Sequence, residues 1–269
     1  MMCKGKLLDD GMTAEVYEWG KDKVIKLFYD GFSDDWINNE AIIGKAVHEI
    51  GIASPAVFEI INVGSRKGIV LERIFGNTML RHIQAEPWKL YYYTRELAGL
   101  HFKIHQFASP EGIPSQKERF IGKINMSSEI LGDRIKAILR YIENLPDGSS
   151  VCHGDFHFDN IFVTENGLVP IDWSNAYIGN PLGDVARTCL MINSPAVQLD
   201  ASDIMMPLFQ YTKWSIYWTY LNEYRKHTRI DLNSIDAWTI PAAAVKIADK
   251  IPGEEKWLMG IIDKHLDKL

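Results

Sequence analysis

Val151-Cys-His-Gly-Asp-Phe-His-Phe-Asp-Asn-Ile-Phe-Val163 is the most informative segment of the chain, and Pro170-Ile-Asp-Trp173 follows it closely. Two short apolar runs, at 160–163 and 168–171, lie on either side of the residues Thr164-Glu-Asn-Gly167. An Asn-Gly pair between β-prone residues is a strong short-range signal for a hairpin. The sequence therefore predicts a β-hairpin with polar residues at its open end.

Three oxygen-bearing side chains stand at this open end. Asp155 and Asn160 lie on the loop that leads into the first strand, and Asp172 follows the second strand. Because a hairpin brings its two open ends together, we expect these side chains to lie close to one another. Two carboxylates and an amide are suitable ligands for a hard cation such as Mg2+. The alternative interpretation is a polar turn in which the same side chains act as local caps.

The spacing within this stretch matches the roles found in the catalytic loop of kinases. In that loop an Asp accepts the substrate proton and a later Asn binds metal, as Asp155 and Asn160 would here. Asp172, within Ile-Asp-Trp, stands where kinases place a metal-binding Asp. The glycine after His153, the second histidine, His157, and the Ile-Asp-Trp variant resemble the aminoglycoside phosphotransferase and choline kinase superfamily. A protein kinase would show His-Arg-Asp and Asp-Phe-Gly instead.

The resemblance implies an α+β fold of the bilobal, protein-kinase-like type. The N-terminal lobe, residues 1–75, would be a small antiparallel sheet with one helix and would bind the nucleotide. The C-terminal lobe, residues 76–269, would be larger and mostly helical and would carry catalysis and substrate binding. The sequence changes from β-prone to helical near residue 75, which places the boundary independently. We expect an active-site cleft between the lobes.

The implied activity is transfer of the γ-phosphoryl group of ATP to an alcohol group of a small molecule, with Mg2+ as cofactor. Asp155 would be the catalytic base, and Asn160 and Asp172 would hold the metal. GTP stays open as an alternative nucleotide. Other functions also stay open: a non-catalytic nucleotide-binding or regulatory module, or a metabolite kinase acting on choline, homoserine or a sugar. A metal hydrolase would have to use the alternating residues His153, Asp155, His157 and Asp159.

The residues before the boundary alternate between β-prone runs and one helical pattern. Ile37, Ala41, Gly44 and Val47 recur at helical spacing and predict a helix over 34–50. The expected strands cover residues 6–9, 15–19, 23–29, 55–63 and 68–72.

Lys26 interrupts an apolar face of the strand at 23–29, because Val24, Lys26 and Phe28 point to the same side. Such a lysine lies at a sheet edge with its head in water, or is aimed into a cleft. By resemblance, Lys26 would contact the α- and β-phosphates of the nucleotide, and Glu40 on the next helix would position it. The alternative for Glu40 is a solvated helix face.

The turn Asp10-Gly-Met-Thr-Ala14 resembles the loop that covers the nucleotide in this superfamily, where backbone N–H groups approach phosphate. Gly11 would allow the close approach, and the hydroxyl of Thr13 would donate to a phosphate. Only one glycine is present, so an ordinary hairpin turn is the alternative.

The expected hinge is Leu71-Glu-Arg-Ile74. By resemblance, the carbonyl of Glu72 and the N–H of Ile74 would bind the adenine edge, and Leu71 would be the gatekeeper. Ile171 would form part of the wall of the base pocket, with plain core packing as the alternative.

The second half of the chain is expected to be helical. Apolar stripes at helical spacing cover 90–104, 131–142, 214–221 and 257–266. Segment 108–125, rich in Pro, Gly and charge, is expected to form a loop or lid. We expect the aromatic stripe at 214–224 to lie in the core rather than to form a cage for an ammonium group. Asp184 would cap its helix or support the catalytic loop.

The composition is that of an ordinary globular protein, with 46% hydrophobic and 24% charged residues among 269. The formal net charge of -6 argues against a nucleic-acid partner and fits a cationic substrate only weakly. Asp200, Asp203 and Glu223 would meet such a substrate or lie in the solvated surface.

Three widely spaced cysteines indicate a reducing compartment, and we expect the cytoplasm. The first ten residues lack the apolar core of a signal peptide, and no apolar run approaches the roughly 20 residues that span a bilayer. No membrane partner is therefore expected. No motif identifies the substrate or the oligomeric state.

Overall fold

The computed structural model describes residues 4–108, 110–196, 206–228 and 231–267. These residues form two compact units. The first contains the chain up to Arg81 together with Pro110–Ile113 and Asp159–Asn175, and the second contains the remainder. The lobe boundary at residue 75 stays a prediction. Asp200 and Asp203 lie outside the described residues.

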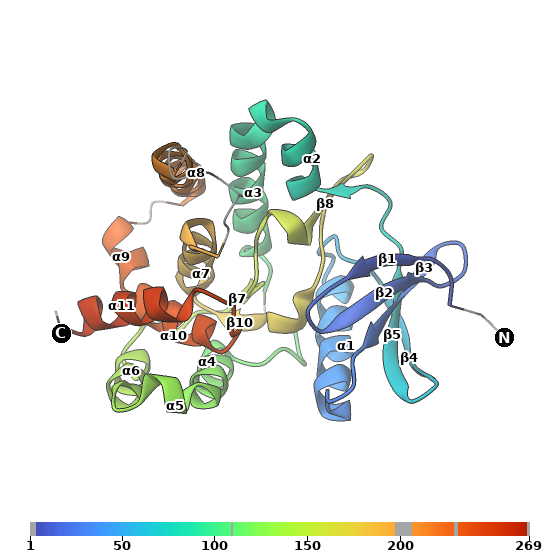
Figure 1. Ribbon diagram of the computed structural model, residues 1–269, viewed down its shortest axis with the longest axis horizontal. Coiled ribbons are helices and arrows are strands. Elements are labelled where there is room, and N and C mark those ends of the chain that lie inside the picture. The colour runs from blue at the N-terminus through green and yellow to red at the C-terminus, as the bar shows by residue number, and fades with distance from the viewer. Residues whose placement is uncertain (1–3, 109, 197–205, 229–230, 268–269) are drawn as a thin grey trace. The chain divides into compact units, whose positions relative to one another are not determined.

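A five-stranded antiparallel sheet in the order β1-β2-β3-β5-β4 forms the centre of the first unit (Figure 1). Its strands are β1 (Leu7–Asp10), β2 (Ala14–Glu18), β3 (Lys23–Phe28), β4 (Val57–Val63) and β5 (Arg66–Glu72). One helix, α1 (Asp34–Glu49), begins after Ser33, whose hydroxyl accepts a hydrogen bond from the N–H of Trp36. The small antiparallel sheet and its single helix confirm the predicted architecture of the N-terminal part.

Apolar side chains cover both faces of this sheet. On one face, Phe28 of β3 packs with Ile37 and Ala41 of α1. On the other face, a second cluster is formed by Tyr17, Trp19, Ile25, Leu27 and Val70. Because side chains alternate along a strand, Lys26 shares the face of Phe28 and is directed toward α1.

A three-stranded sheet in the order β6-β8-β9 also belongs to the first unit. Strands β8 (Ile161–Thr164) and β9 (Gly167–Pro170) form the predicted hairpin, in which Thr164 pairs with Gly167. The Asn-Gly signal is therefore confirmed, although Gly167, with a φ of +119°, is the first residue of β9 rather than part of the turn. The short strand β6 (Asn77–Thr78), which pairs with β8, was not predicted from the sequence.

Gly76 is the residue that lets β6 approach the hairpin. Its φ is +149°, and a Cβ added here would lie 2.2 Å from the carbonyl oxygen of Val163. We expect Gly76→Ala to lower the free energy of unfolding by about 3 kcal/mol, because the backbone must move to relieve this clash. Gly64→Ala, with a φ of +64° and open space around the added Cβ, is the matched control and should cost about 1 kcal/mol. Urea denaturation measures both, and equal losses would contradict the clash.

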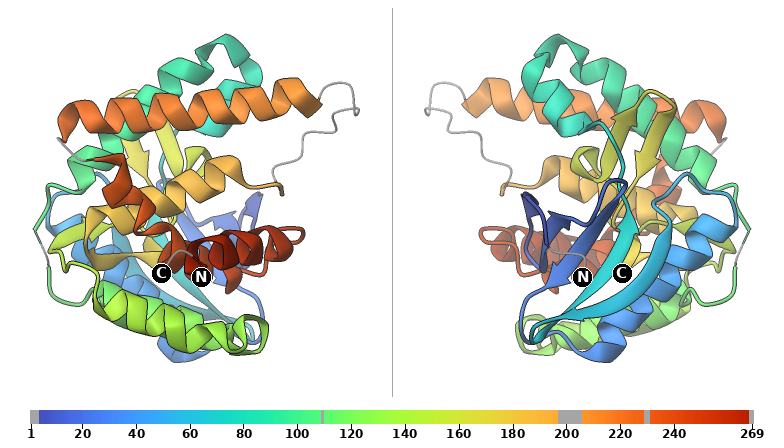
Figure 2. Two further views of the ribbon diagram at one scale, coloured as in Figure 1. Left: turned by 90° about the vertical axis from the view of Figure 1, so that its left-hand side faces the viewer. Right: turned by 90° about the vertical axis from the view of Figure 1, so that its right-hand side faces the viewer.

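The second unit is mostly helical (Figure 2). Its helices are α3 (Leu90–Ile104), α4 (Gln116–Met126), α5 (Ser128–Leu131), α6 (Arg134–Glu143), α7 (Pro181–Asn193), α8 (Met206–His227), α9 (Leu232–Asp236), α10 (Thr239–Ile247) and α11 (Glu255–Leu266). Helix α2 (Met79–Ala85) begins in the first unit and ends in the second. Strands β7 (Ser150–Cys152) and β10 (Tyr177–Gly179) pair antiparallel. The α+β fold class is confirmed.

Three short 3-10 helices complete the secondary structure of the described chain: η1 (Pro87–Lys89), η2 (Phe158–Asn160) and η3 (Trp173–Asn175). Among the described helices, none combines the length and the apolar character that crossing a membrane requires.

The expected loop at 108–125 is wrong in its C-terminal part, because helix α4 begins at Gln116. The helix starts with a capping box. The Ser115 hydroxyl accepts a hydrogen bond from the N–H of Glu118, and the Glu118 carboxylate accepts one from the N–H of Ser115. Ser-x-x-Glu is a sequence signal for a helix start, and it was masked by the Pro, Gly and charge of the segment.

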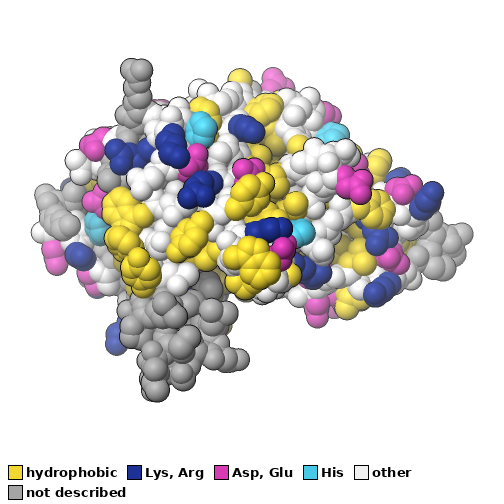
Figure 3. Space-filling model, turned by 90° about the horizontal axis from the view of Figure 1, so that it is seen from above, with side chains coloured by type: hydrophobic (Ala, Val, Ile, Leu, Met, Phe, Trp, Pro, Cys, Tyr) yellow, Lys and Arg dark blue, Asp and Glu magenta, His cyan; other side chains and the backbone are white. Residues whose placement is uncertain are grey.

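The aromatic stripe of α8 is only in part a core stripe. Tyr220, Leu221 and Tyr224 are buried, as predicted, whereas the side chain of Trp214 is 56% exposed and stacks with Tyr211. The prediction of a core position is therefore wrong for Trp214. Figure 3 shows one face of the molecule on which hydrophobic side chains reach the surface among charged ones.

Candidate active site

Lys26 is held between two carboxylates within the first unit. From β3, its ammonium nitrogen lies 2.6 Å from Oε1 of Glu40 on α1 and 3.2 Å from Oδ1 of Asp172 after β9. The side chains of Lys26 and Glu40 are nearly buried, whereas that of Asp172 is 38% exposed. The strand, the helix and the hairpin thus bring together three residues that the sequence analysis had singled out.

The charge of Lys26 is stabilised by this arrangement. Burial alone would lower the pKa of Lys26, but the carboxylates of Asp172 and Glu40 outweigh it and hold this pKa above its usual range. Oε2 of Glu40 is buried without a hydrogen-bond partner among the described residues. Lys26 is therefore a fixed cation, held in place by its partners, of the kind that binds a phosphate group.

Asn160 and Asp172 lie at the open end of the hairpin. The N–H of Ile171 donates a hydrogen bond of 2.9 Å to the carbonyl of Asn160, which ties the two strand ends together. The Ser174 hydroxyl donates to Oδ1 of Asp172 at 2.9 Å. Asp172 has a φ of +59°, one of two positive values for non-glycine residues in the described chain, and such backbone strain clusters at functional sites. Carboxylate and amide oxygens are the ligands that Mg2+ prefers, so the chemistry of this donor pair fits the ion.

The predicted nucleotide-covering turn connects β1 with β2. The N–H of Gly11 donates to the carbonyl of Ala14 at 3.0 Å, and the carbonyl of Thr13 accepts from the N–H of Tyr29 at 3.1 Å. The turn is thereby fastened to β2 and to the end of β3. Met12 at its tip is 72% exposed.

The predicted hinge begins at the end of β5. Leu71 pairs with Val24 of β3, and the Glu72 carboxylate accepts a hydrogen bond of 3.1 Å from the N–H of Ala56. Ile74 follows the strand and is partly buried, as Ile171 is after β9. The strand ends at Glu72, as the sequence predicted. It stays a prediction that a nucleotide base is held by Leu71, Glu72, Ile74 and Ile171.

Asp155 lies in the second unit on the loop after β7. Its Oδ1 is 3.3 Å from Nη2 of Arg187, and its Oδ2 is 3.6 Å from Nε2 of His157. Its N–H donates to Nδ1 of His153 at 3.3 Å. Burial alone would raise the pKa of Asp155, but the hydrogen bond from His157 and the charge of Arg187 hold this pKa well below its usual range. The carboxylate is therefore ionised at every physiological pH.

Asp184 fastens the backbone of the same loop. Its buried carboxylate accepts hydrogen bonds from the N–H of His153 at 2.6 Å and from the N–H of Gly154 at 3.0 Å. Of the two predicted roles of Asp184, a helix cap or a support of the catalytic loop, the structure supports the second. Helix α7 is capped instead by Asn180, whose side chain accepts from the N–H of Leu182.

Two histidines and two tyrosines complete this buried network, and the sequence analysis missed them. Nε2 of His101 and of His105, both on α3, lie 3.0 and 3.3 Å from Oδ2 of Asp184. Their Nδ1 atoms lie 2.6 and 2.7 Å from the hydroxyls of Tyr220 and Tyr224 on α8. An ionised carboxylate only accepts, so each Nε2–H donates to Asp184 and each Nδ1 accepts from a tyrosine. The i, i+4 spacing of both pairs was the available signal.

Among the described residues, one group of three or more His, Cys, Asp or Glu side chains lies close enough together to share an ion, namely His101, His105 and Asp184. The hydrogen bonds above engage both nitrogens of each imidazole, so we interpret the cluster as structural. The alternating residues of the metal-hydrolase interpretation form no such group in the described chain, and Asp159 accepts a hydrogen bond from Thr78 at 2.8 Å.

Stability should depend on pH through His101. Burial lowers the pKa of His101 from 6.5 to about 4, so between these values the unfolded chain binds a proton that the folded chain does not. The free energy of unfolding should therefore fall by about 3 kcal/mol as the pH drops from above 6.5 to 4. In urea titrations across this range, His101→Gln should flatten the dependence. His227→Gln, at an exposed position, should leave this pH dependence unchanged. If the free energy of unfolding falls equally with pH in the wild type and both variants, His101 is not the cause.

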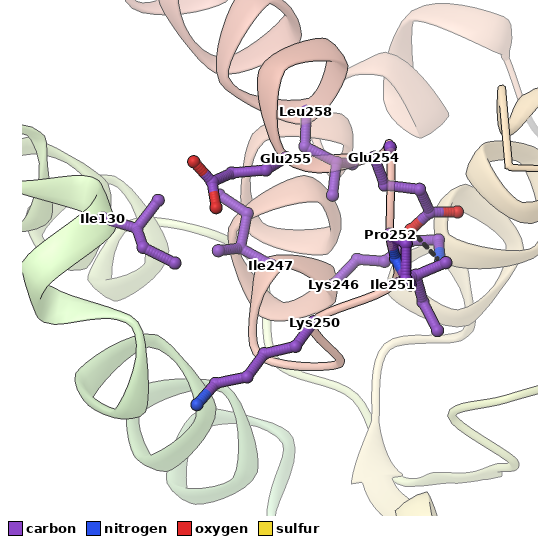
Figure 4. Close-up of a pocket in the computed structure, with 10 residues that line it drawn as sticks. Ile130, Lys246, Ile247, Lys250, Ile251, Pro252, Glu254, Glu255 and Leu258 are labelled. Atoms are coloured by element: carbon purple, nitrogen blue, oxygen red, sulfur yellow. Dashed lines mark ion pairs between the residues drawn. The ribbon is translucent and has the colours of Figure 1, made fainter. Parts of the chain in front are cut away.

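A cavity of about 270 Å³ lies elsewhere in the second unit (Figure 4). It is lined by Ile130 of α5 and by residues of α10, α11 and their connection. Lys246 and Glu254 at its wall form a buried ion pair of 2.6 Å. The cavity shares no residue with the network around Asp155 and Asp184.

Comparisons with known proteins identify the family of the chain and its fold. The sequence model of the family described as "Phosphotransferase enzyme family" matches residues 4–203. No curated protein sequence matches the chain. Among solved structures, an amicoumacin kinase in complex with AMP-PNP and Ca2+ has a TM-score of 0.64 at 14% identity and covers 98% of this chain and 88% of its own.

Two further solved structures have the same fold. An aminoglycoside-3'-phosphotransferase of type VIII has a TM-score of 0.59 at 17% identity, covering 91% of this chain and 94% of its own. A choline kinase from Cryptosporidium parvum Iowa II has a TM-score of 0.59 at 15% identity, covering 98% and 88%. These identities show the kinase-like fold alone, whereas the family match extends over most of the sequence. The chain belongs to the phosphotransferase enzyme family.

Proposed function

We propose that this protein is a small-molecule kinase that transfers the γ-phosphoryl group of ATP to a hydroxyl group of its substrate. The observation that carries the proposal is the position of Lys26 between Glu40 and Asp172, at 2.6 and 3.2 Å. A lysine fixed in this way has the phosphate-binding role of the strand lysine in kinase-like enzymes. The base and both metal donors lie on one continuous stretch, from Asp155 to Asp172.

Nucleotide binding is assigned to residues of the first unit. Lys26 binds the α- and β-phosphates, and Glu40 orients it. Backbone N–H groups of the turn at Gly11 and Thr13 approach the phosphates, and the hinge at Leu71, Glu72 and Ile74 holds the base, with Ile171 as part of the wall. ATP is the proposed nucleotide, with GTP as an outcome that a binding assay distinguishes.

Asn160 and Asp172 would hold Mg2+, because both are oxygen donors at the tied end of one hairpin. When bound, the ion neutralises charge on the nucleotide phosphates. Ser174 and Lys26 both contact Oδ1 of Asp172 and so fix the direction of its carboxylate.

Asp155 orients the acceptor hydroxyl and receives its proton. Its lowered pKa makes it a weak base but keeps it an ionised hydrogen-bond acceptor. Phosphoryl transfer proceeds through a loose transition state, in which the acceptor loses its proton late and correct orientation matters more than strong basicity. An ionised, rigidly held aspartate suits this role.

The substrate is proposed only as a class, a small molecule with a hydroxyl group. The structures named above are an amicoumacin kinase, an aminoglycoside phosphotransferase and a choline kinase, so cationic amino sugars and amino alcohols are the first candidates. Glu223 pairs with Lys226 at 2.7 Å and is not assigned to a cationic substrate. We propose a cytoplasmic enzyme, where ATP is available.

A coupled assay of ADP release, run with aminoglycosides, amino alcohols and sugars in turn, tests the proposal. We expect one class to stimulate ADP release well above the rate without acceptor. Binding of ATP in a thermal-shift assay without stimulation by any class would favour the alternative of a non-catalytic nucleotide-binding module. Absence of both binding and stimulation would contradict both functions.

A further inference from the structure

Arg187 of α7 bridges Asp155 and a second aspartate. Its side chain is only 4% exposed, and the single atom Nη2 lies 3.3 Å from Oδ1 of Asp155 and 2.7 Å from Oδ2 of Asp249. Asp249 follows the end of α10, so the bridge joins three segments of the second unit. Because one nitrogen serves both carboxylates, the two compete for the same positive charge.

The bridge continues beyond Asp249. Oδ1 of Asp249 lies 3.4 Å from the ammonium nitrogen of Lys123 on α4. Charges of alternating sign therefore run from Asp155 through Arg187 and Asp249 to Lys123. The Nε and Nη1 atoms of Arg187 are buried without hydrogen-bond partners among the described residues, and Nη2 is the guanidinium atom that contacts both carboxylates. A buried ion pair often stabilises a fold no more than well-packed apolar residues would, so stability alone does not account for this pairing.

We propose that Arg187 is a positioning residue for Asp155, and that Asp249 sets how much of the Arg187 charge Asp155 experiences. The proposal rests on the proposed function of Asp155 as the base that orients the acceptor hydroxyl. Arg187 holds Oδ1, which leaves Oδ2 as the oxygen that faces His157. The arginine charge is permanent, so it keeps the carboxylate ionised and oriented across the physiological pH range.

The other charged or titratable neighbours of Asp155 act differently. His157 is about one-third exposed, and its Nε2 faces the other carboxylate oxygen, Oδ2, at 3.6 Å. His153 is buried and accepts the N–H of Asp155 through Nδ1. Asp184 binds the backbone of the loop rather than the carboxylate. Arg187 thus supplies a permanent positive charge in direct contact with the carboxylate of Asp155.

The proposal is tested by two substitutions, at Arg187 and at Asp249, that should shift the pKa of Asp155 in opposite directions. In protein with 13C-labelled aspartate carboxyls, with the Asp155 signal assigned by its loss in Asp155→Asn, NMR titration gives the pKa directly. Arg187→Met should raise the pKa of Asp155, because a positive charge is lost and the Asp249 charge remains nearby. Asp249→Asn should lower it further, because Arg187 then has a single carboxylate to neutralise. Arg187→Lys should keep most of the wild-type value.

Kinetics test positioning separately from charge. Arg187→Met should reduce kcat on the order of 10²-fold with little change in the KM for ATP, since misplacing a catalytic group costs about this much. Arg187→Lys should recover part of this loss. Arg134→Met, which breaks the ion pair between Arg134 and Asp263 in the same unit, is the matched control and should retain the wild-type pKa of Asp155 and the wild-type kcat.

The two readouts separate this proposal from the proposed function. If the chain phosphorylates no acceptor but the pKa shifts have the expected signs, the electrostatic role of Arg187 stands and the function fails. If Arg187→Met leaves both the pKa and kcat unchanged, or if Arg187→Met and Asp249→Asn shift the pKa in the same direction, the proposal is overturned. Should Arg187→Met fail to fold, the double variant Arg187→Met, Asp249→Asn removes the pair together and should still raise the pKa of Asp155 above the wild-type value.

Discussion

Asp155→Asn is expected to lower kcat by roughly 10²–10⁴-fold, the range that a positioned acid–base group contributes. The asparagine amide keeps the size of the side chain, but it no longer provides an anionic oxygen for the acceptor proton. The backbone of the loop should remain in place, because Asp184 still accepts from the N–H groups of His153 and Gly154. Affinity for MgATP should therefore change little.

Thermal shift with MgATP and steady-state kinetics with the acceptor measure these two quantities in the same preparation. Asp147→Asn, at a surface position paired with Lys117, is the matched control and should behave as wild type in both. A loss of MgATP affinity as large as the loss of turnover would place Asp155 in nucleotide binding and remove it from catalysis.

Asp172→Asn should abolish the tighter binding of MgATP relative to ATP without the metal. Of the two proposed metal donors, Asp172 is the only carboxylate, and the substitution removes it. The substitution also removes one of the two carboxylates that pair with Lys26. We expect turnover to fall by about 10²–10³-fold, as is typical when one electrostatic contact to the transition state is lost. We also expect the thermal shift produced by MgATP to fall to that produced by ATP with chelator.

Asp34→Asn is the control for this experiment. Asp34 also pairs with a lysine of the first unit, Lys67 at 2.6 Å, but at a side chain that is 72% exposed. Its loss should leave both the MgATP shift and the turnover near wild type, because exposed ion pairs contribute little. If Asp172→Asn retains a full MgATP shift, the metal is held elsewhere.

Short-range patterns in the sequence predicted the parts of the site that depend on neighbouring residues. The Asn-Gly turn signal located the hairpin, and the hairpin placed Asn160 and Asp172 at its tied end. The alternation of β3 placed Lys26 on the face that α1 covers, from which Glu40 reaches it. In both cases one local rule determines the direction of a side chain.

The features that were missed depend on contacts between distant segments, or on a weak local signal. His101 and Tyr220 are separated by 119 residues, and the spacing of each pair on its own helix does not say which helices meet. The bridge from Asp155 through Arg187 to Asp249 likewise joins separate segments. The capping box at Ser115 was a local signal, but the charged, Pro-rich and Gly-rich segment around it favoured a loop.

Transfer of the γ-phosphoryl group to an acceptor hydroxyl is tested most directly by mass spectrometry of the acceptor after incubation with ATP whose γ-phosphoryl group carries oxygen-18. We expect one acceptor class to gain a phosphoryl group that retains the label, the acceptor to keep its own oxygen, and Asp155→Asn to suppress the product. Labelled inorganic phosphate as the sole product with every acceptor class, at a rate that Asp155→Asn leaves unchanged, would contradict it.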